Sequence, residues 1–243
     1  MLYRHPITLP EESKKFYESE YVEKGLTTEL PSDDILNSLL DKRFMGSEKD
    51  FSSWMPLFEA LSMKLGRPLK VLDYGANWGY TVFQLEGQSF VSECVGYEYS
   101  NSRSAYGKAK LGITYIDIED FDGTFDVIFT SHVIEHMYDP ALFRKRADAI
   151  LKEDGYVILT CPNGSMTALF DHPKIWRQKW GLVHPNMISD AYLVNLFGGY
   201  NGGVFDENLS ETAISAMMDY GTVPVASLLP KTGHLLAVMS KKH

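Results

Sequence analysis

The sequence predicts an α/β fold built on a doubly wound, mostly parallel, seven-stranded sheet with one antiparallel strand near its C-terminal edge. From Pro68 onward, short apolar runs alternate with stretches of helical periodicity, as in parallel strands joined by crossover helices. Near the end of the chain, only residues 230–233 separate two apolar runs. Because this connection is too short for a crossover, we expect these two strands to pair as an antiparallel hairpin.

Each predicted strand is a short, largely apolar run, and each predicted helix is a longer and more polar stretch between such runs. In chain order, we expect strands at residues 69–74, 93–100, 113–118, 125–131, 155–161, 223–229 and 234–241. We expect helices near residues 79–87, 102–110, 140–152 and 210–220.

Two regions do not follow this alternation. Residues 1–66 are polar and contain several prolines and helical patches, so we expect a helical leader there. Residues 162–209 are rich in Pro, Gly, Trp and His and follow a predicted strand, where insertions overhang the ligand crevice of open α/β sheets. We therefore expect a domain of residues 67–243, with the insertion at about 162–209 and the leader as cap elements.

The composition limits the partners. The net charge of −9, from 23 basic and 32 acidic residues, argues against a nucleic-acid partner. No apolar run is long enough to span a membrane, and the N-terminus lacks the apolar core of a signal peptide. Cys94 and Cys161 lie far apart in apolar runs, so we expect buried thiols in a cytoplasmic protein. The oligomeric state stays open.

The stretch VLDYGANWGY, residues 71–80, reads as a strand, a glycine turn and a helix. Dinucleotide-binding turns use three glycines, whereas here Asn77 stands between Gly75 and Gly79. Asn tolerates a left-handed backbone, so the turn can form. Asp73 precedes the turn, and its charge disfavours a pyrophosphate but suits an ammonium group. S-adenosylmethionine (SAM), which has an amino-acid tail and no phosphate, fits this turn better than a nicotinamide dinucleotide does.

From about residue 69 to residue 161, the order and spacing of the segments resemble a class I SAM-dependent methyltransferase, a Rossmann-like fold. The resemblance is to the group that includes ubiquinone-pathway and sugar methyltransferases. LDYGANWG is similar to the first motif of that family, with Asn77 as a departure. FDVIFTSHVIEHMYDP is similar to the fourth-strand motif, and EDGYVILTCPN to the fifth-strand signature. The resemblance implies SAM as cofactor and S-adenosylhomocysteine (SAH) as product.

The resemblance also implies a set of cofactor-binding residues. The turn that contains Asp73, Gly75, Asn77 and Gly79 would wrap the methionine end of SAM. Glu98 follows Gly75 by 23 residues, and its two oxygens suit the two ribose hydroxyls.

Further cofactor contacts are expected after the next strands. Tyr99 follows Glu98, and we place it near the cofactor. Asp117 would lie near the adenine amino group with Ile118 against the ring, although Glu119 and Asp120 compete with Asp117 for this role. The residues from Ser131 onward would line the crevice where the sulfonium meets the acceptor.

His132 and His136 are the candidate catalytic residues. They are four residues apart with Glu135 between them, so in a helix both would lie on one face. His136 is the first candidate for a general base toward a hydroxyl, because imidazole titrates near neutral pH. The alternative is that the Glu-His pair only holds the turn.

Residues His132, Glu135, His136 and His184 also resemble the metal ligands of small-RNA terminal 2′-O-methyltransferases. Those enzymes use two acids and two histidines, whereas His132 stands here at the position of the first acid. Because a net charge of −9 provides no RNA-binding surface, we expect no metal site and keep a metal-dependent RNA 2′-O-methyltransferase as an alternative.

The expected activity is methyl transfer from SAM to a small-molecule acceptor, at a hydroxyl oxygen of a sugar or another polyhydroxylated metabolite. A non-catalytic SAM-binding regulatory protein is the second alternative, and the His/Glu group argues against it. In the insertion, His172, Trp176 and Trp180 either close over the acceptor or anchor the insertion by packing. The leader pair Tyr17 and Tyr21 either lies in a segment that folds over the cofactor, as the resemblance to sugar methyltransferases implies, or serves packing.

Overall fold

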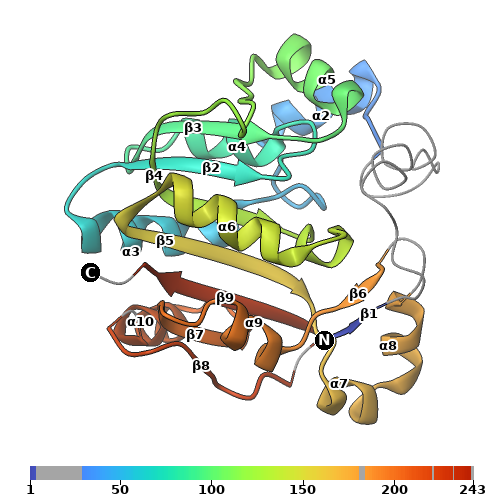
Figure 1. Cartoon of the computed structure of the whole chain (residues 1–243). Coiled ribbons are helices and arrows are strands. Elements are labelled where there is room, and N and C mark those ends of the chain that lie inside the picture. Colours follow the sequence, from blue (N-terminus) through green and yellow to red (C-terminus); the bar gives the residue numbers. More distant parts are fainter. Residues whose placement is uncertain (4–28, 181–183, 221, 232, 242–243) are drawn as a thin grey trace. The chain divides into compact units, whose positions relative to one another are not determined.

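The computed structural model describes residues 1–3, 29–180, 184–220, 222–231 and 233–241 (Figure 1). It divides the chain into two units. The N-terminal unit is Glu11–Asp120, and the C-terminal unit is Phe121–His243 together with Met1–Pro10.

The N-terminal unit holds two parallel strands with helices before, between and after them. In its described part the elements are α2 (Asp33–Asp41), η2 (Ser52–Trp54), α3 (Met55–Leu65), β2 (Leu69–Tyr74), α4 (Tyr80–Glu86), β3 (Val91–Tyr97) and α5 (Asn101–Leu111). α4 forms the crossover between β2 and β3, whose register places Asp73 opposite Gly96. β2 is buried along nearly all of its length, as expected of a parallel strand covered on both faces.

The C-terminal unit holds the larger part of the sheet. Its elements are β1 (Leu2–Tyr3), β4 (Phe125–Ser131), η3 (Ile134–His136), α6 (Pro140–Ile150), β5 (Leu151–Pro162), α7 (Met166–Asp171), α8 (Pro173–Lys179), β6 (Asn186–Met187), α9 (Asp190–Leu196), β7 (Asn201–Asp206), α10 (Glu211–Tyr220), β8 (Ala226–Ser227) and β9 (His234–Ser240). The sheet strands of this unit run in the order β4-β5-β9-β7-β8. β4 and β5 are parallel and joined by α6, while β7 and β8 are parallel and joined by α10.

The predicted fold class is confirmed. The two sheet strands of the N-terminal unit and the five of the C-terminal unit give seven strands, of which β9 is the antiparallel one. The crossover helix α6 begins where a side chain caps it: Asp139 accepts a hydrogen bond from the backbone N–H of Ala141, and Pro140 occupies the first turn of the helix. Figure 1 shows α6 running along β5 within the C-terminal unit.

The predicted hairpin between residues 223–229 and 234–241 is wrong. β8 is only two residues long and pairs in parallel with β7, while β9 lies antiparallel between β5 and β7. β7 falls inside the segment expected to be an insertion. Its glycines suggested a loop, but a Cβ on Gly202 would collide with the Val238 carbonyl, so glycine here permits close strand pairing.

The predicted strand at 113–118 is also wrong, since this segment makes only an isolated parallel bridge between Tyr115 and Gly96. The described part of the leader contains α2 and α3, whereas Tyr17 and Tyr21 lie outside the described residues. That the leader and the insertion act as caps stays a prediction.

Two expectations about composition can be compared with the structure. Cys94 and Cys161 are both buried and do not form a disulfide with each other. Among the described residues, no helix combines the length and the apolar character needed to cross a membrane.

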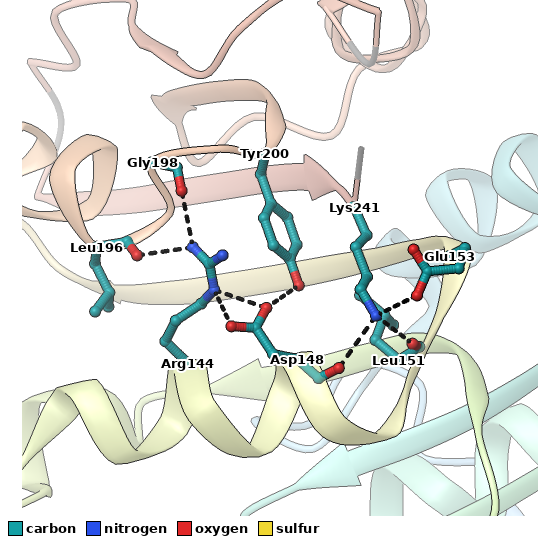
Figure 2. Close-up of polar contacts among 8 residues, drawn as sticks. All are labelled: Arg144, Asp148, Leu151, Glu153, Leu196, Gly198, Tyr200 and Lys241. Carbon is teal, nitrogen blue, oxygen red and sulfur yellow. Dashed lines mark hydrogen bonds and ion pairs between the residues drawn. The ribbon is translucent and has the colours of Figure 1, made fainter. Parts of the chain in front are cut away.

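A polar network fixes the connection between α9 and β7 to α6 (Figure 2). The Arg144 Nε donates to both carboxylate oxygens of Asp148 at 2.9 Å, and its Nη1 donates to the Leu196 carbonyl at 2.9 Å and the Gly198 carbonyl at 3.4 Å. Tyr200 donates its hydroxyl to Asp148 at 3.0 Å, and its ring centroid lies 4.3 Å from the Arg144 Cζ. The planar guanidinium therefore joins a helix, a carboxylate, two carbonyls and a ring.

A second cation extends this network to the end of β9. The Lys241 Nζ donates to the carbonyls of Asp148 and Leu151 at 3.1 and 3.2 Å, and it lies 2.8 Å from Glu153 Oε1. The start of β5 and the end of β9 are thus held at the C-terminal end of α6.

Replacement of Arg144 by Lys is expected to lower the free energy of unfolding by about 1–2 kcal/mol, because an ammonium cannot reproduce the planar fork. Partial exposure of the pair limits the loss. Chemical denaturation measures it, with Lys145→Ala on the exposed side of the same helix as control, expected within about 0.5 kcal/mol of wild type. Equal losses in the two variants would contradict the role of the network.

Candidate active site

β2 leads directly into a left-handed turn. Gly75, Asn77 and Gly79 have φ values of 91°, 51° and 82°, in a region that Gly and Asn adopt most readily. The Asn77 side chain also supports the turn, because its Oδ1 accepts a hydrogen bond from the Trp78 N–H at 2.9 Å. The turn therefore forms although Asn replaces the middle glycine, as the sequence predicted.

The segment after α5 lies directly against this turn. A Cβ on Gly79 would lie 2.6 Å from Ile113 Cγ1 and 2.9 Å from the Tyr115 hydroxyl. The Tyr115 hydroxyl donates a hydrogen bond to the Asn77 carbonyl at 2.9 Å. Tyr115 was not among the residues predicted from the sequence, where its only signal is a polar aromatic residue within an apolar run.

Glu98 fastens the turn to the end of β3. Its Oε2 accepts a hydrogen bond from the Asn77 N–H at 2.8 Å, and its Oε1 accepts one from the Ser100 N–H at 2.7 Å. Burial raises the pKa of Glu98, although the Ser100 bond, the Arg103 charge and the Asn77 bond oppose the shift. Because a carboxylate oxygen can accept more than one hydrogen bond, both oxygens can still accept from ligand hydroxyls.

Asp73 is the second acidic group of this region and is only 4% exposed. Burial, together with the negative charge of Glu98, raises the pKa of Asp73 to about 8. A positively charged ligand group would favour the ionised form of both carboxylates. These two carboxylates therefore fit SAM, which carries an ammonium group, a sulfonium and a ribose diol.

Part of the leader packs on the same turn. The Trp78 ring is fully buried in a cluster with Leu36 and Phe44, and the Phe44 and Trp78 ring centroids are 6.1 Å apart. The Tyr106 hydroxyl of α5 donates to the Pro31 carbonyl at 2.8 Å. Residues 31–44 thus support the turn, whereas their sequence predicted only a helical pattern.

The structure places the other candidate cofactor residues as follows. Tyr99 is 46% exposed just after β3, and Ile118 is buried. Asp117 is exposed, and its Oδ1 accepts a hydrogen bond from the Glu119 N–H at 3.1 Å. Ser131 ends β4 in the C-terminal unit and is half-buried. Their contacts with a cofactor stay predictions.

The predicted histidine pair follows β4 in the C-terminal unit. His132 has a φ of 55°, and its N–H donates to the Thr160 carbonyl at 2.9 Å. Residues 134–136 form only a 3-10 turn, so the two histidines do not share one face of an α-helix. They are instead linked through Glu135, whose Oε1 lies 3.3 Å from His132 Nδ1.

Glu135 is a buried carboxylate among imidazoles and is 1% exposed. Burial would raise the pKa of Glu135, but the polar contact with His132 and the charges of His136 and His132 outweigh it, so the pKa is lowered. Glu135 therefore stays ionised at neutral pH. A carboxylate in this position can orient an imidazole and stabilise its protonated form.

Tertiary structure brings two more histidines to this group. The ring centroids of His136 and His184 are 4.7 Å apart, and those of His132 and His234 are 5.1 Å apart. His234 Nδ1 lies 2.9 Å from Glu207 Oε2. His234 was missed because it opens the last strand, and only the pairing of β9 with β5 places it opposite Pro162.

The aromatic residues of the insertion serve packing in part. Trp176 is 4% exposed and packs with Ala168 and Met187, while Trp180, with its ring centroid 5.6 Å from that of Trp176, is 39% exposed. A cavity of about 210 Å³ lies beside Trp176 and is also lined by Asn163 and Ile175. Trp176 therefore packs within residues 162–209 and also forms part of a concave surface.

Solved structures with the same fold include several methyltransferases. The plantazolicin methyltransferase BamL, in complex with a triazolic desmethylPZN analogue and SAH, has a TM-score of 0.58 at 14% identity, covering 88% of this chain and 92% of that chain. A possible histamine N-methyltransferase from Thermotoga maritima has a TM-score of 0.51 at 17% identity, covering 86% and 95%. At these identities the likeness shows the fold alone. The chain has the class I methyltransferase fold.

A family model described as a methyltransferase domain matches residues 47–201, more than half of the chain. No curated protein matches the sequence of this chain. The chain belongs to this methyltransferase-domain family and is a class I methyltransferase with SAM as its cofactor. The matched range includes the glycine turn, Glu98 and the segment from His132 to His136.

Replacement of Gly79 by Ala is expected to weaken SAH binding about tenfold or more. The added Cβ would displace Ile113 and Tyr115, and Tyr115 holds the Asn77 carbonyl of the turn. Calorimetric titration with SAH measures the change.

Gly66→Ala is the matched control, because Gly66 has a φ of 67° but nothing within 4 Å of an added Cβ. This variant is expected to lose about 1 kcal/mol of stability from backbone strain and to bind SAH normally. Normal SAH binding by folded Gly79→Ala would show that the packed turn does not position the cofactor.

Proposed function

We propose that the protein transfers the methyl group of SAM to a hydroxyl oxygen of a small molecule, such as a sugar or another polyhydroxylated metabolite. The cofactor assignment rests on two acidic groups, the buried Asp73 and the half-buried Glu98, which lie beside a left-handed glycine turn. The observation that carries the hydroxyl acceptor is the His132–Glu135–His136 group.

Each cofactor residue has a role that follows from its chemistry. Asp73 faces the ammonium of the methionine end, and the turn formed by Gly75, Asn77 and Gly79 wraps that end. Glu98 accepts hydrogen bonds from the ribose hydroxyls while it holds the Asn77 N–H. SAM supplies a methyl group on a positively charged sulfur, a good electrophile.

The remaining cofactor contacts concern the adenosine and the sulfonium. Tyr99 and Ile118 provide apolar surface, Asp117 accepts from the adenine amino group, and Ser131 lies at the sulfonium. These roles follow the family resemblance of the motif order.

On the acceptor side, His136 acts as the general base. The acceptor oxygen forms a bond to the methyl carbon as the carbon–sulfur bond breaks, and its proton passes to the His136 imidazole. The ionised Glu135 stabilises the imidazolium, and His132 orients Glu135. A hydroxyl needs such a base because its own pKa is high, whereas a neutral amine would not.

A small acceptor is favoured by charge. A net charge of −9 disfavours a polyanionic acceptor such as a nucleic acid. The similar structures are named for plantazolicin and for histamine, so they do not define the acceptor of this chain.

SAH affinity is expected to rise with pH between about 6 and 8, by at most about tenfold per pH unit. The pKa of Asp73 in the folded protein is raised to about 8, so below this pH the carboxyl is protonated and must lose its proton when the ammonium binds. Proton release, measured by calorimetry in buffers of different ionisation enthalpy, should accompany binding.

The Asp73→Asn variant is expected to bind SAH more weakly and with a flat pH profile. Asp41→Asn, which alters an exposed carboxylate of the same unit, should behave as wild type. Glu98→Gln is a second variant in case Asp73→Asn does not fold. No SAH binding by folded wild type, or a pH dependence that persists in Asp73→Asn, would refute this assignment.

Once a screen of hydroxylated metabolites has identified an acceptor, His136→Asn is expected to lower its turnover by about a hundredfold or more. SAH affinity should change less than about twofold, because His136 acts on the acceptor and not on the cofactor. SAH release during turnover is the measurement. Unchanged turnover in His136→Asn would contradict the role of His136 as general base and would indicate that the histidine group is structural.

A further inference from the structure

We propose that Glu135, His136 and His184 bind one divalent transition-metal cation, with Zn²⁺ as the best match. Each residue offers one ligand atom, and these three atoms all lie within 4.8 Å of one another. Two imidazole nitrogens and one carboxylate oxygen form a ligand set that suits Zn²⁺ and related ions.

The buried carboxylate is the first reason to place a cation here. Glu135 is 1% exposed, and its Oε2 accepts no hydrogen bond from any residue that the structure describes. Its Oε1 has the 3.3 Å contact with His132 Nδ1. A buried carboxylate with an unsatisfied oxygen is costly, and a coordinated cation would remove that cost.

The second reason is that the fold holds His184 at this place. The Asn186 side-chain amide, two residues after His184, donates to the Met137 carbonyl at 2.6 Å and to the Glu135 carbonyl at 3.4 Å. Asn186 is also part of β6, which pairs with β1. The segment that carries His184 is therefore fastened to the backbone on both sides of His136.

His132 is a positioning residue rather than a ligand. It contacts Glu135, and an imidazole that holds a ligand carboxylate fixes the orientation of that ligand. The structure thus gives three protein ligands, and not the four positions of the RNA methyltransferase pattern. The expectation of no metal rested on the lack of an RNA-binding surface, which does not bear on a small acceptor.

Three protein ligands leave a coordination position for another oxygen, as in catalytic zinc sites. The catalytic consequence rests on the methyl transfer of the proposed function and changes one role in it. A cation here would lower the pKa of the acceptor hydroxyl, whose proton would pass to water, and His136 would be a metal ligand and not the general base. Binding of the metal is tested without any acceptor.

The test is a Co²⁺ titration of untagged, EDTA-dialysed full-length protein, followed by visible absorption. We expect one equivalent to bind with micromolar or higher affinity, with displacement by Zn²⁺. The tag must be absent because a histidine tag binds the same ions.

His184→Ala and Glu135→Gln are expected to weaken Co²⁺ binding about a hundredfold, and His132→Ala about tenfold. His172→Ala, which removes a histidine outside the cluster in the same unit, should bind as wild type. Circular dichroism verifies that each variant is folded, and two independent ligand variants allow for the failure of one.

The inference is overturned by the absence of saturable absorption in wild type, or by equal Co²⁺ affinity in wild type and folded His184→Ala. Equal losses in His172→Ala and His184→Ala would also overturn it, because they indicate adventitious binding. SAH titration is run in parallel. SAH binding without Co²⁺ binding refutes only the metal site, whereas Co²⁺ binding without SAH binding refutes the cofactor assignment.

Discussion

The Glu98 carboxylate accepts hydrogen bonds from Asn77 and Ser100, and the turn between β2 and α4 in the N-terminal unit depends on them. One bond holds the left-handed turn after β2, and the other holds the residue that precedes α5. A turn with three positive φ values is unfavourable for a free chain and persists only where its surroundings fix it. The Tyr115 hydroxyl and the buried Trp78 ring provide the rest of this support.

The two buried carboxylates on which the proposed function depends have opposite environments. Asp73 lies near another acidic group, so burial and repulsion raise its pKa, and the favourable partner is a cationic ligand. Glu135 lies among imidazoles, so its pKa is lowered in spite of burial, and it is ionised before any ligand binds. The same functional group is therefore suited to receive a positive charge at one site and to organise imidazoles at the other.

The strands predicted from the sequence are correct where the local pattern of apolar residues is strong. β2 and β4 have the predicted boundaries, because a strand buried on both faces is a continuous apolar run that ends where polarity returns. β7 was missed because its glycines resemble a loop, and only the neighbouring β9 shows why glycine is required there. The predicted hairpin failed because a short connection does not force the strands on either side of it to pair: β9 pairs with β7 and β5 instead of with β8.

By itself, the sequence determined the α/β class, the glycine turn, the candidate pair Asp73 and Glu98, and the family to which the chain is similar. These features are encoded within short segments, where periodicity and residue type are sufficient. Tertiary structure alone decided that β9 lies between β5 and β7 and that His234 approaches His132. Both depend on contacts between segments far apart in the chain, and local sequence does not specify which distant strand or loop will provide the partner.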